Sequence, residues 1–394
     1  MHVAIVVQPA HGHVNPMLPL VSELLSRGHR VSYATGPECV PSVASSGARV
    51  ITLPTRVPAM YWPEGATDER VDGMLNALST GVRESLPILL REFSEDPPDV
   101  LCYDLTTEEG RILSKLLDVP SAALVPHFAF HENLGMRDAI AIEEDWTSQD
   151  PGWPWQRYHK AMKEIAASHG VTWQDDALDG SSVADLNLVL IPKEFQYEAD
   201  TFDERFHFIG PLENSQAQTE KWTPANPDTN LLFVSFGTLF NNNPQFYRTC
   251  FEAFGDLDWE VAMAAHKLDI SELGPIPSNF EVRPYFPQLD VMRNATAVVS
   301  HTGIKTLMDA VTCGVPMVIV PPVPMCKLIA QRAEAEGLAR CLDPATLDAE
   351  TLRNAVEQIP HDEEIRLGVR RYQQAIADCG GARAGVDALE AYLG

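Results

Sequence analysis

The residues best suited to acid–base chemistry are a histidine and an aspartate that each follow a short apolar run. His13 lies in the stretch PAHGHVNP, directly after VAIVVQ, and Asp104 ends a second run, DVLCYD. A histidine at the carboxyl end of a strand can act as a general base near neutral pH, and an aspartate on its other ring nitrogen fixes the tautomer and stabilises the imidazolium. His11 is a competing base. The simpler alternative is that His13 and Asp104 only cap the elements that follow them.

A second opening, AVVSHTG followed by IKTLMDAVTCG, could bind an anion. A pyrophosphate at this helix N-terminus would meet the helix dipole, backbone amides, the Thr306 hydroxyl and the Lys305 ammonium. Asp309, two turns into the helix, suits the hydroxyls of a ribose; the alternative is an ordinary capped helix with Asp309 in solvent. The remaining candidates for this site are small, aromatic, amide or imidazole residues near strand ends: Ser235, Gly237, Thr238, Tyr285, Gln288, His301 and Gly303.

The elements that must position these residues alternate along both halves of the chain. Strand-like apolar runs followed by helix-like patterns predict βαβ units, and two such series in 394 residues predict an α/β protein with two Rossmann-like domains of parallel sheet, facing each other across a cleft. Asn15 and Pro16 should start the first helix, with Gly12 and Gly28 allowing tight turns. The expected boundaries are an N-terminal domain over 1–212, a linker over 213–228, a C-terminal domain over 229–375 and a final helix over 376–394.

Composition and missing motifs exclude several classes of protein. The formal net charge of −26 argues against binding to nucleic acid or to an anionic membrane. The seven cysteines have no zinc or CxxC spacing, and no apolar run approaches the roughly 20 residues of a membrane span, so we expect a cytoplasmic protein. The absence of P-loop, GxGxxG, HExxH, nucleophile-elbow and Asp-x-Asp patterns argues against nucleotide hydrolases, dehydrogenases, zincins and α/β-hydrolases, and predicts no metal and no resident cofactor.

With these residues in place, the chain resembles the UDP-glycosyltransferase family, in its bacterial and fungal macrolide-type branch. The resemblance covers nearly the whole length and rests on five motifs in order: PAHGHVNPMLPLVSELLSRGHRV, PDVLCYD, LLFVSFGTLFNNNPQFY, NFEVRPYFPQLDVM and SHTGIKTLMDAVTCGVPMVIVPP. It implies the two-domain GT-B fold, with the acceptor bound mainly by the N-terminal domain, the nucleotide sugar by the C-terminal domain, and the final helix crossing back to the N-terminal domain.

The resemblance also implies roles for individual residues. His13 matches the catalytic base and Asp104 its orienting partner. In the donor site, Tyr285 stands at the place of a uracil-stacking Trp, Gln288 matches a nucleoside contact, and Asp309 replaces a ribose-binding Glu. The diphosphate contacts are implied for the turn Ser235, Gly237 and Thr238 and for His301.

Two departures from the family pattern bear on the donor. Lys305 stands where the family often has a small residue or Asn, and Met325 and Cys326 replace the acidic residue and Gln that bind the sugar hydroxyls. The aromatic candidates for contact with an apolar acceptor are Trp62, Phe128 and Trp146, the last two at or within an aromatic stretch from about 128 to 179 that we expect to be a helical excursion on the sheet.

We therefore expect an inverting glycosyltransferase that moves a sugar, glucose by preference, from a UDP-sugar to a hydroxyl of a phenol, flavonoid, sterol or macrolide. An alternative is a degenerate homologue that binds nucleotide or aglycone without transfer; Met325 and Cys326 favour it, and the pair of His13 and Asp104 opposes it. A third is another GT-B enzyme such as a nucleotide-sugar epimerase, which the PAHGHVNP motif fits poorly.

Overall fold

The computed structural model describes residues 1–55, 68–104, 107–131, 134, 154–172, 184–212, 221–237, 243–266 and 268–394, without the side chains of 68, 154–156, 324 and 325. Trp62, Trp146 and Thr238 therefore lie outside the described residues, and so does the side chain of Met325. Within them the chain forms two compact units. Unit 1 contains residues 1–55, 68–212 and 379–394, and unit 2 contains residues 221–378.

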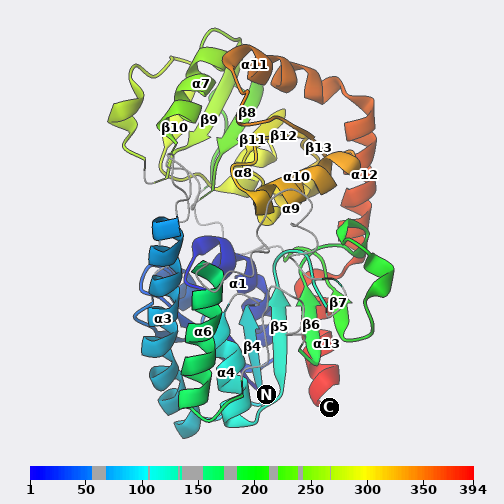
Figure 1. Ribbon diagram of the computed structural model, residues 1–394. Helices are drawn as coiled ribbons and strands as arrows, with labels where there is room; N and C mark the ends of the chain where they lie inside the picture. Colours follow the sequence, from blue (N-terminus) through cyan, green and yellow to red (C-terminus); the bar gives the residue numbers. More distant parts are fainter. Residues whose placement is uncertain are drawn as a thin grey trace. The chain divides into compact units, whose positions relative to one another are not determined.

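Unit 1 is built on a parallel sheet whose described strands have the order β3-β2-β1-β4-β5-β6-β7. Figure 1 shows β4 to β7 side by side. The strands are β1 (His2–Val6), β2 (Arg30–Thr35), β3 (Arg49–Thr52), β4 (Val100–Asp104), β5 (Ser121–Val125), β6 (Leu186–Val189) and β7 (Phe206–Phe208). The helices are α1 (His11–Ser26), α2 (Val40–Ser45), α3 (Asp68–Glu95), α4 (Glu108–Leu117), α6 (Pro154–Ser168) and α13 (Gly381–Leu393), with 3₁₀ turns η1 (Lys193–Phe195) and η2 (Ala199–Thr201).

The sheet of unit 1 is buried on both faces, which explains why its strands read as continuous apolar runs. Along β1, Val3 and Ile5 belong to one hydrophobic cluster, whereas Ala4 and Val6 belong to the other, as the two-residue period of a strand requires. Helices α1 and α13 supply the first cluster, and α3, α4 and α6 supply the second. The central strands are thereby fixed, and their carboxyl ends present side chains at defined positions.

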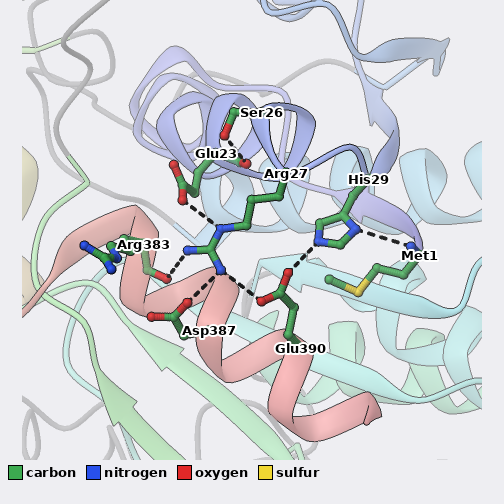
Figure 2. A network of polar contacts seen from close by, with 8 residues as sticks. All are labelled: Met1, Glu23, Ser26, Arg27, His29, Arg383, Asp387 and Glu390. Atoms are coloured by element: carbon green, nitrogen blue, oxygen red, sulfur yellow. Dashed lines mark hydrogen bonds and ion pairs between the residues drawn. The ribbon is translucent and has the colours of Figure 1, made fainter.

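Helix α13 is also fastened to the end of α1 by a polar network (Figure 2). The Arg27 guanidinium donates to Glu23 at 2.8 Å, to Asp387 at 2.6 Å and to Glu390 at 2.9 Å. His29 Nε2 lies 2.8 Å from the second Glu390 oxygen, and this hydrogen bond is the main cause that holds the pKa of Glu390 below its ordinary value. The apolar face of α13 thus packs on the core of unit 1, while its other side is held by ion pairs.

The segment predicted as one final helix over 376–394 is divided. Helix α12 (Glu363–Asp378) runs through its first residues, and α13 begins after Gly380, whose φ of 82° lies in the left-handed region that favours glycine. The end of the predicted linker packs on unit 2: Trp222 is 8% exposed, and its indole N–H donates to Glu281 at 3.0 Å.

Unit 2 repeats the architecture of unit 1, with the described strands in the order β10-β9-β8-β11-β12-β13. The strands are β8 (Asn230–Ser235), β9 (Trp259–Ala264), β10 (Phe280–Arg283), β11 (Ala297–Ser300), β12 (Met317–Ile319) and β13 (Ala339–Cys341). The other elements are α7 (Pro244–Phe254), α8 (Gln288–Met292), α9 (Ile304–Cys313), α10 (Pro324–Ala335), α11 (Ala349–Gln358) and α12, with 3₁₀ turns η3 (Ile270–Leu273) and η4 (Ile359–His361).

Both sheets are parallel, and their strand order reverses at corresponding places, between β1 and β4 in unit 1 and between β8 and β11 in unit 2. In open α/β sheets such a reversal point opens a crevice at the carboxyl ends of the strands, where ligands bind. The prediction of two Rossmann-like domains with parallel sheets is confirmed. No helix among the described residues is long and apolar enough to cross a membrane.

Candidate functional site

His13 comes from the first turn of α1, not from a loop before it. The sequence predicted a helix start at Asn15 and Pro16, but α1 begins at His11 and includes Pro16 and Pro19. The buried face of α1 against the sheet outweighs the backbone hydrogen bonds that the prolines cannot make. Of the two glycines expected in turns, Gly28 has φ 81°, whereas Gly12 lies inside the helix. The result is a histidine on a rigid element at the switch point of unit 1.

Asp104 ends β4, the strand beside β1 at the same switch point, and its side chain is fully buried. His13 Nδ1 lies 2.6 Å from Asp104 Oδ2, whereas His11 Nδ1 lies 3.9 Å from the Cys39 sulfur. The structure thus places His13, and not His11, on the carboxylate. An ionised carboxylate can only accept, so Nδ1 of His13 carries the hydrogen and Nε2 keeps its lone pair.

The electrostatics of this pair favour the protonated imidazole. Burial by itself lowers the pKa of His13, but the negative charge of Asp104 and the hydrogen bond to it together outweigh burial, so the pKa is raised above its ordinary value. The side chain of His13 remains 20% exposed, so one side of the ring is accessible to a ligand. An imidazole with a free Nε2 and a carboxylate on Nδ1 can take a proton from a hydroxyl and hold it.

Sequence reasoning missed a second histidine near this pair. His127 follows β5, whose Leu124 pairs with Asp104 in register, so His127 lies at the same edge of the sheet. Its Nδ1 lies 2.9 Å from the carbonyl oxygen of Phe128 and donates to it. Burial lowers the pKa of His127, and the nearby charge of His13 lowers it further, although Phe128 and Asp104 partly offset this. His127 is therefore a neutral imidazole in the field of the pair.

A buried glutamate was also missed. Glu109 lies in the first turn of α4, five residues after Asp104 in the sequence, and is 6% exposed. Burial raises its pKa to about 7, and the charges of Glu108 and Asp104 add to the shift. Helix α4 lies tightly on β4: a Cβ on Gly110 would stand 2.4 Å from Tyr103 Cβ. In the sequence Glu109 reads as an ordinary acidic residue at a helix start; only this packing makes it a carboxyl that titrates near neutral pH.

In unit 2 the turn after β8 and the turn after β11 come together. Ser235 pairs in register with Ser300, so Gly237 and His301 follow neighbouring strand ends. A Cβ on Gly237 would stand 2.7 Å from His301 Cε1, and Gly237 has φ 62°, so glycine alone suits this position. Burial lowers the pKa of His301 to about 4, although its hydrogen bond to the Ser235 backbone opposes the shift. His301 is therefore neutral at pH 7, and its one N–H donates to the Ser235 backbone carbonyl, so its other ring nitrogen can donate to an anion only once the ring is protonated.

The helix after β11 carries the other predicted donor residues. Gly303 is the N-cap of α9, and Thr306 is buried in its first turn. Asp309 is 6% exposed and makes an ion pair with Lys305, while Gln288 Nε2 donates to Asp309 Oδ2 at 2.7 Å. These bonds bring together three of the residues predicted for nucleotide binding, and Asp309 does not face solvent.

Three more of the predicted contact residues differ in exposure: Tyr285 is exposed, whereas Phe128 and Cys326 are buried. Tyr285 is 66% exposed, as a ring that stacks on a base requires. Phe128 is 1% exposed, and its ring stacks on Phe195 at 5.4 Å, so it serves the core of unit 1 and the expectation of acceptor contact finds no support. Cys326 is 4% exposed, and burial raises its thiol pKa to about 12, so it is a neutral buried group.

Comparison with known proteins extends this picture to the whole chain. Residues 248–379 match the family model of the erythromycin biosynthesis protein CIII-like C-terminal domain. The chain is 32% identical over 395 residues to the NDP-glycosyltransferase YjiC of Bacillus subtilis (strain 168), covering 100% of this chain and 97% of that protein. It is 31% identical over 396 residues to the oleandomycin glycosyltransferase of Streptomyces antibioticus, covering 100% and 91%.

Among solved structures, the calicheamicin glycosyltransferase CalG4 matches with a TM-score of 0.83 and 32% identity, covering 100% of this chain and 98% of that one. The two parallel-sheet domains are therefore those of a GT-B glycosyltransferase. The chain belongs to the macrolide-type glycosyltransferase family. It transfers a sugar from a nucleotide sugar to a natural product or another small-molecule acceptor.

Proposed function

We propose that this glycosyltransferase is an inverting enzyme that takes glucose from UDP-glucose and delivers it to a hydroxyl of an apolar acceptor such as a phenol, flavonoid, sterol or macrolide. The observation that carries the proposal is the 2.6 Å contact of His13 Nδ1 with Asp104. This contact leaves Nε2 to take the proton of the acceptor hydroxyl while Asp104 stabilises the imidazolium. The oxygen then attacks the anomeric carbon from the face opposite UDP, which turns an α-linked donor into a β-linked product.

The leaving diphosphate would be stabilised in unit 2 by preorganised groups. The turn of Ser235 and Gly237 and the first amides of α9 offer donors where negative charge develops as the bond to UDP breaks, and His301 adds a donor when it is protonated. Asp309 would accept hydrogen bonds from the ribose hydroxyls, and Gln288 would donate one to a ribose oxygen. Tyr285 would stack on the uracil ring. This arrangement supports catalysis by protein groups with neither a metal nor a resident cofactor.

The test is to incubate the protein with UDP-glucose and a panel of phenols, flavonoids and macrolides, and to measure product mass and free UDP. We expect a hexosyl adduct with a β-anomeric proton coupling in the NMR spectrum. A parallel series with TDP-glucose tests which nucleobase the donor site prefers. The pyrophosphate contacts are common to both donors, so a difference between them comes from the nucleoside. An α-linked product would disprove inversion, and transfer from TDP-glucose alone would disprove the choice of UDP.

The control is His13→Ala, which should abolish transfer to weakly acidic alcohols and leave UDP affinity unchanged. If UDP affinity fell as much as the transfer rate, His13 would not be the catalytic base. The second candidate, a homologue that binds without transfer, is favoured by the buried thiol of Cys326 at a position expected to bind the sugar. It predicts that UDP binds but that no donor in the series is consumed.

A further inference from the structure

Lys305 holds an unusual place in α9. It is the second residue of the helix, and the first turn contains no acidic residue. The N-terminal end of a helix carries partial positive charge and unpaired N–H groups, so a lysine in the first turn is unfavourable unless an anion compensates it. The order of Lys before Asp at i and i+4 is also the less favourable one for an isolated helix. Something other than helix stability therefore explains a cation at this position.

In this structure the compensating anion is Asp309. The Lys305 ammonium contacts Asp309 Oδ1, and Gln288 donates to Asp309 Oδ2 at 2.7 Å. The Asp309 side chain is only 8% exposed, so its charge requires partners, whereas that of Lys305 is 33% exposed. Each carboxylate oxygen thus already has a donor, and Lys305 supplies the positive one from a flexible stem.

The turn that leads into α9 shows a second sign of an anion site. Thr302 is fully buried and has φ 72°, a strained conformation for a β-branched residue. Its hydroxyl has no hydrogen-bond partner among the described residues. Buried polar groups without partners and strained backbone both cluster at functional sites. A ligand with acceptor oxygens at this turn would lie next to the first turn of α9 and within reach of a lysine there.

We propose that Lys305 couples recognition of the pyrophosphate to recognition of the ribose. While Lys305 is paired with Asp309, the carboxylate is a poor acceptor for ribose hydroxyls. A pyrophosphate at the start of α9 draws the ammonium away, because it offers more negative charge, and so releases Asp309 to the ribose. This inference rests on the proposed function, which places a nucleoside diphosphate in unit 2. Its consequence is that a nucleoside without phosphates binds poorly.

The competing explanation is that the pair of Lys305 and Asp309 only braces α9. Loss of a brace weakens every ligand of the site in the same proportion. Loss of a coupling residue changes the two affinities in opposite directions. A ligand with a pyrophosphate binds more weakly because it loses a cation, whereas a ligand with only the ribose binds more tightly because the carboxylate of Asp309 is no longer paired with Lys305. The two explanations are therefore separated by comparing a ligand that has the diphosphate with one that lacks it.

The experiment measures the affinities of UDP and uridine by calorimetry, with uridine in displacement of UDP, for the wild type and Lys305→Met. We expect UDP to bind roughly 30-fold more weakly to the variant, and uridine to bind about threefold more tightly. Lys193→Met is the matched control, because it removes a lysine whose ion pair with Asp200 is exposed in unit 1. It should change neither affinity.

Asp309→Asn provides a background in which Lys305→Met leaves no buried charge, so a folding defect is avoided. In this background Lys305→Met should still weaken the binding of UDP, but it should no longer tighten the binding of uridine. Equal weakening of UDP and uridine by Lys305→Met would overturn the coupling and leave the proposed function standing. If the wild type bound neither ligand and consumed no UDP-glucose, the proposed donor would fail and the coupling with it.

Discussion

His13 in unit 1 and His301 in unit 2 both follow a central strand of a parallel sheet with the same strand order, yet their pKa values move in opposite directions. Burial lowers the pKa of both rings. In unit 1 the carboxylate of Asp104 at 2.6 Å outweighs burial, whereas in unit 2 a backbone hydrogen bond to Ser235 does not. One neighbouring charge therefore decides which histidine accepts a proton easily.

This difference suits two chemical tasks on one architecture. A general base needs an imidazole that holds the proton it takes, and Asp104 provides this by stabilising the imidazolium. A group that meets a diphosphate can instead stay neutral until the anion binds: His301 lies against Gly237, gives its one N–H to the Ser235 backbone, and becomes a donor to the anion when it takes up a proton. His13 follows β1, whereas His301 follows β11, which holds the place of β4 in the strand order of unit 2. The neighbours of each histidine, and not the fold alone, therefore decide its task.

The largest effect should come from removing the charge that separates the two histidines. Asp104→Asn should lower kcat/KM by about 10²- to 10⁴-fold at its plateau, because the imidazolium loses its stabilising partner. The rate rises with pH as His13 loses its proton, so a lower pKa of His13 should also move the acidic limb of the profile to lower pH. Transfer rates measured from about pH 5 to pH 9 test both effects. An acidic limb that stays in place would show that Asp104 does not tune His13.

A smaller effect on ligand binding is expected for His301 in unit 2. There the negative charge beside the histidine should come from the bound ligand, because no carboxylate among the described residues plays the part that Asp104 plays for His13 in the pKa of His301. His301 is neutral at pH 7 because its pKa is about 4, so the negative charge of UDP should raise that pKa and cause net proton uptake near pH 6. His301→Gln should abolish this uptake and weaken UDP roughly tenfold. Calorimetry in buffers of different ionisation enthalpy measures the protons. UDP itself titrates in this range, so the variant supplies the baseline, and unchanged uptake in it would disprove the idea.

Much of the architecture follows from local patterns in the sequence. The run VAIVV reads as a buried strand, because every residue is apolar and both faces of the sheet are covered. Asp104, at the end of a similar run, must lie at a carboxyl edge. The pair of Lys305 and Asp309 was also readable, since residues at i and i+4 share a helix face, but only the structure shows that Gln288, 21 positions away, completes the set.

The rest depended on packing between distant segments. The helical start at His11 is set by the sheet beneath α1 and not by local propensity, which the prolines oppose. His127 follows an apolar run that reads as core, and its nearness to His13 comes from the pairing of β4 with β5. Phe128 was assigned to the acceptor for its aromatic ring, but burial against Phe195 is a property of the folded core.

A last effect, on stability and not on activity or ligand binding, concerns Glu109, a second buried carboxyl near the pair in unit 1. Its folded pKa of about 7 lies above its unfolded value, so the folded state binds more protons between the two values and stability falls as pH rises through that window. Glu109→Gln removes the buried charge. The variant should equal the wild type at low pH and be more stable by about 2–3 kcal/mol above the folded pKa.

Denaturant unfolding at a series of pH values measures this difference, with the exposed Glu84→Gln on α3 as the matched control that should change stability by less than about 0.5 kcal/mol. A variant less stable than the wild type above pH 7 would mean that the ionised Glu109 has a partner that stabilises it. The ionised carboxylate of Glu109 would then be a further stabilised charge in unit 1, beside the pair of His13 and Asp104.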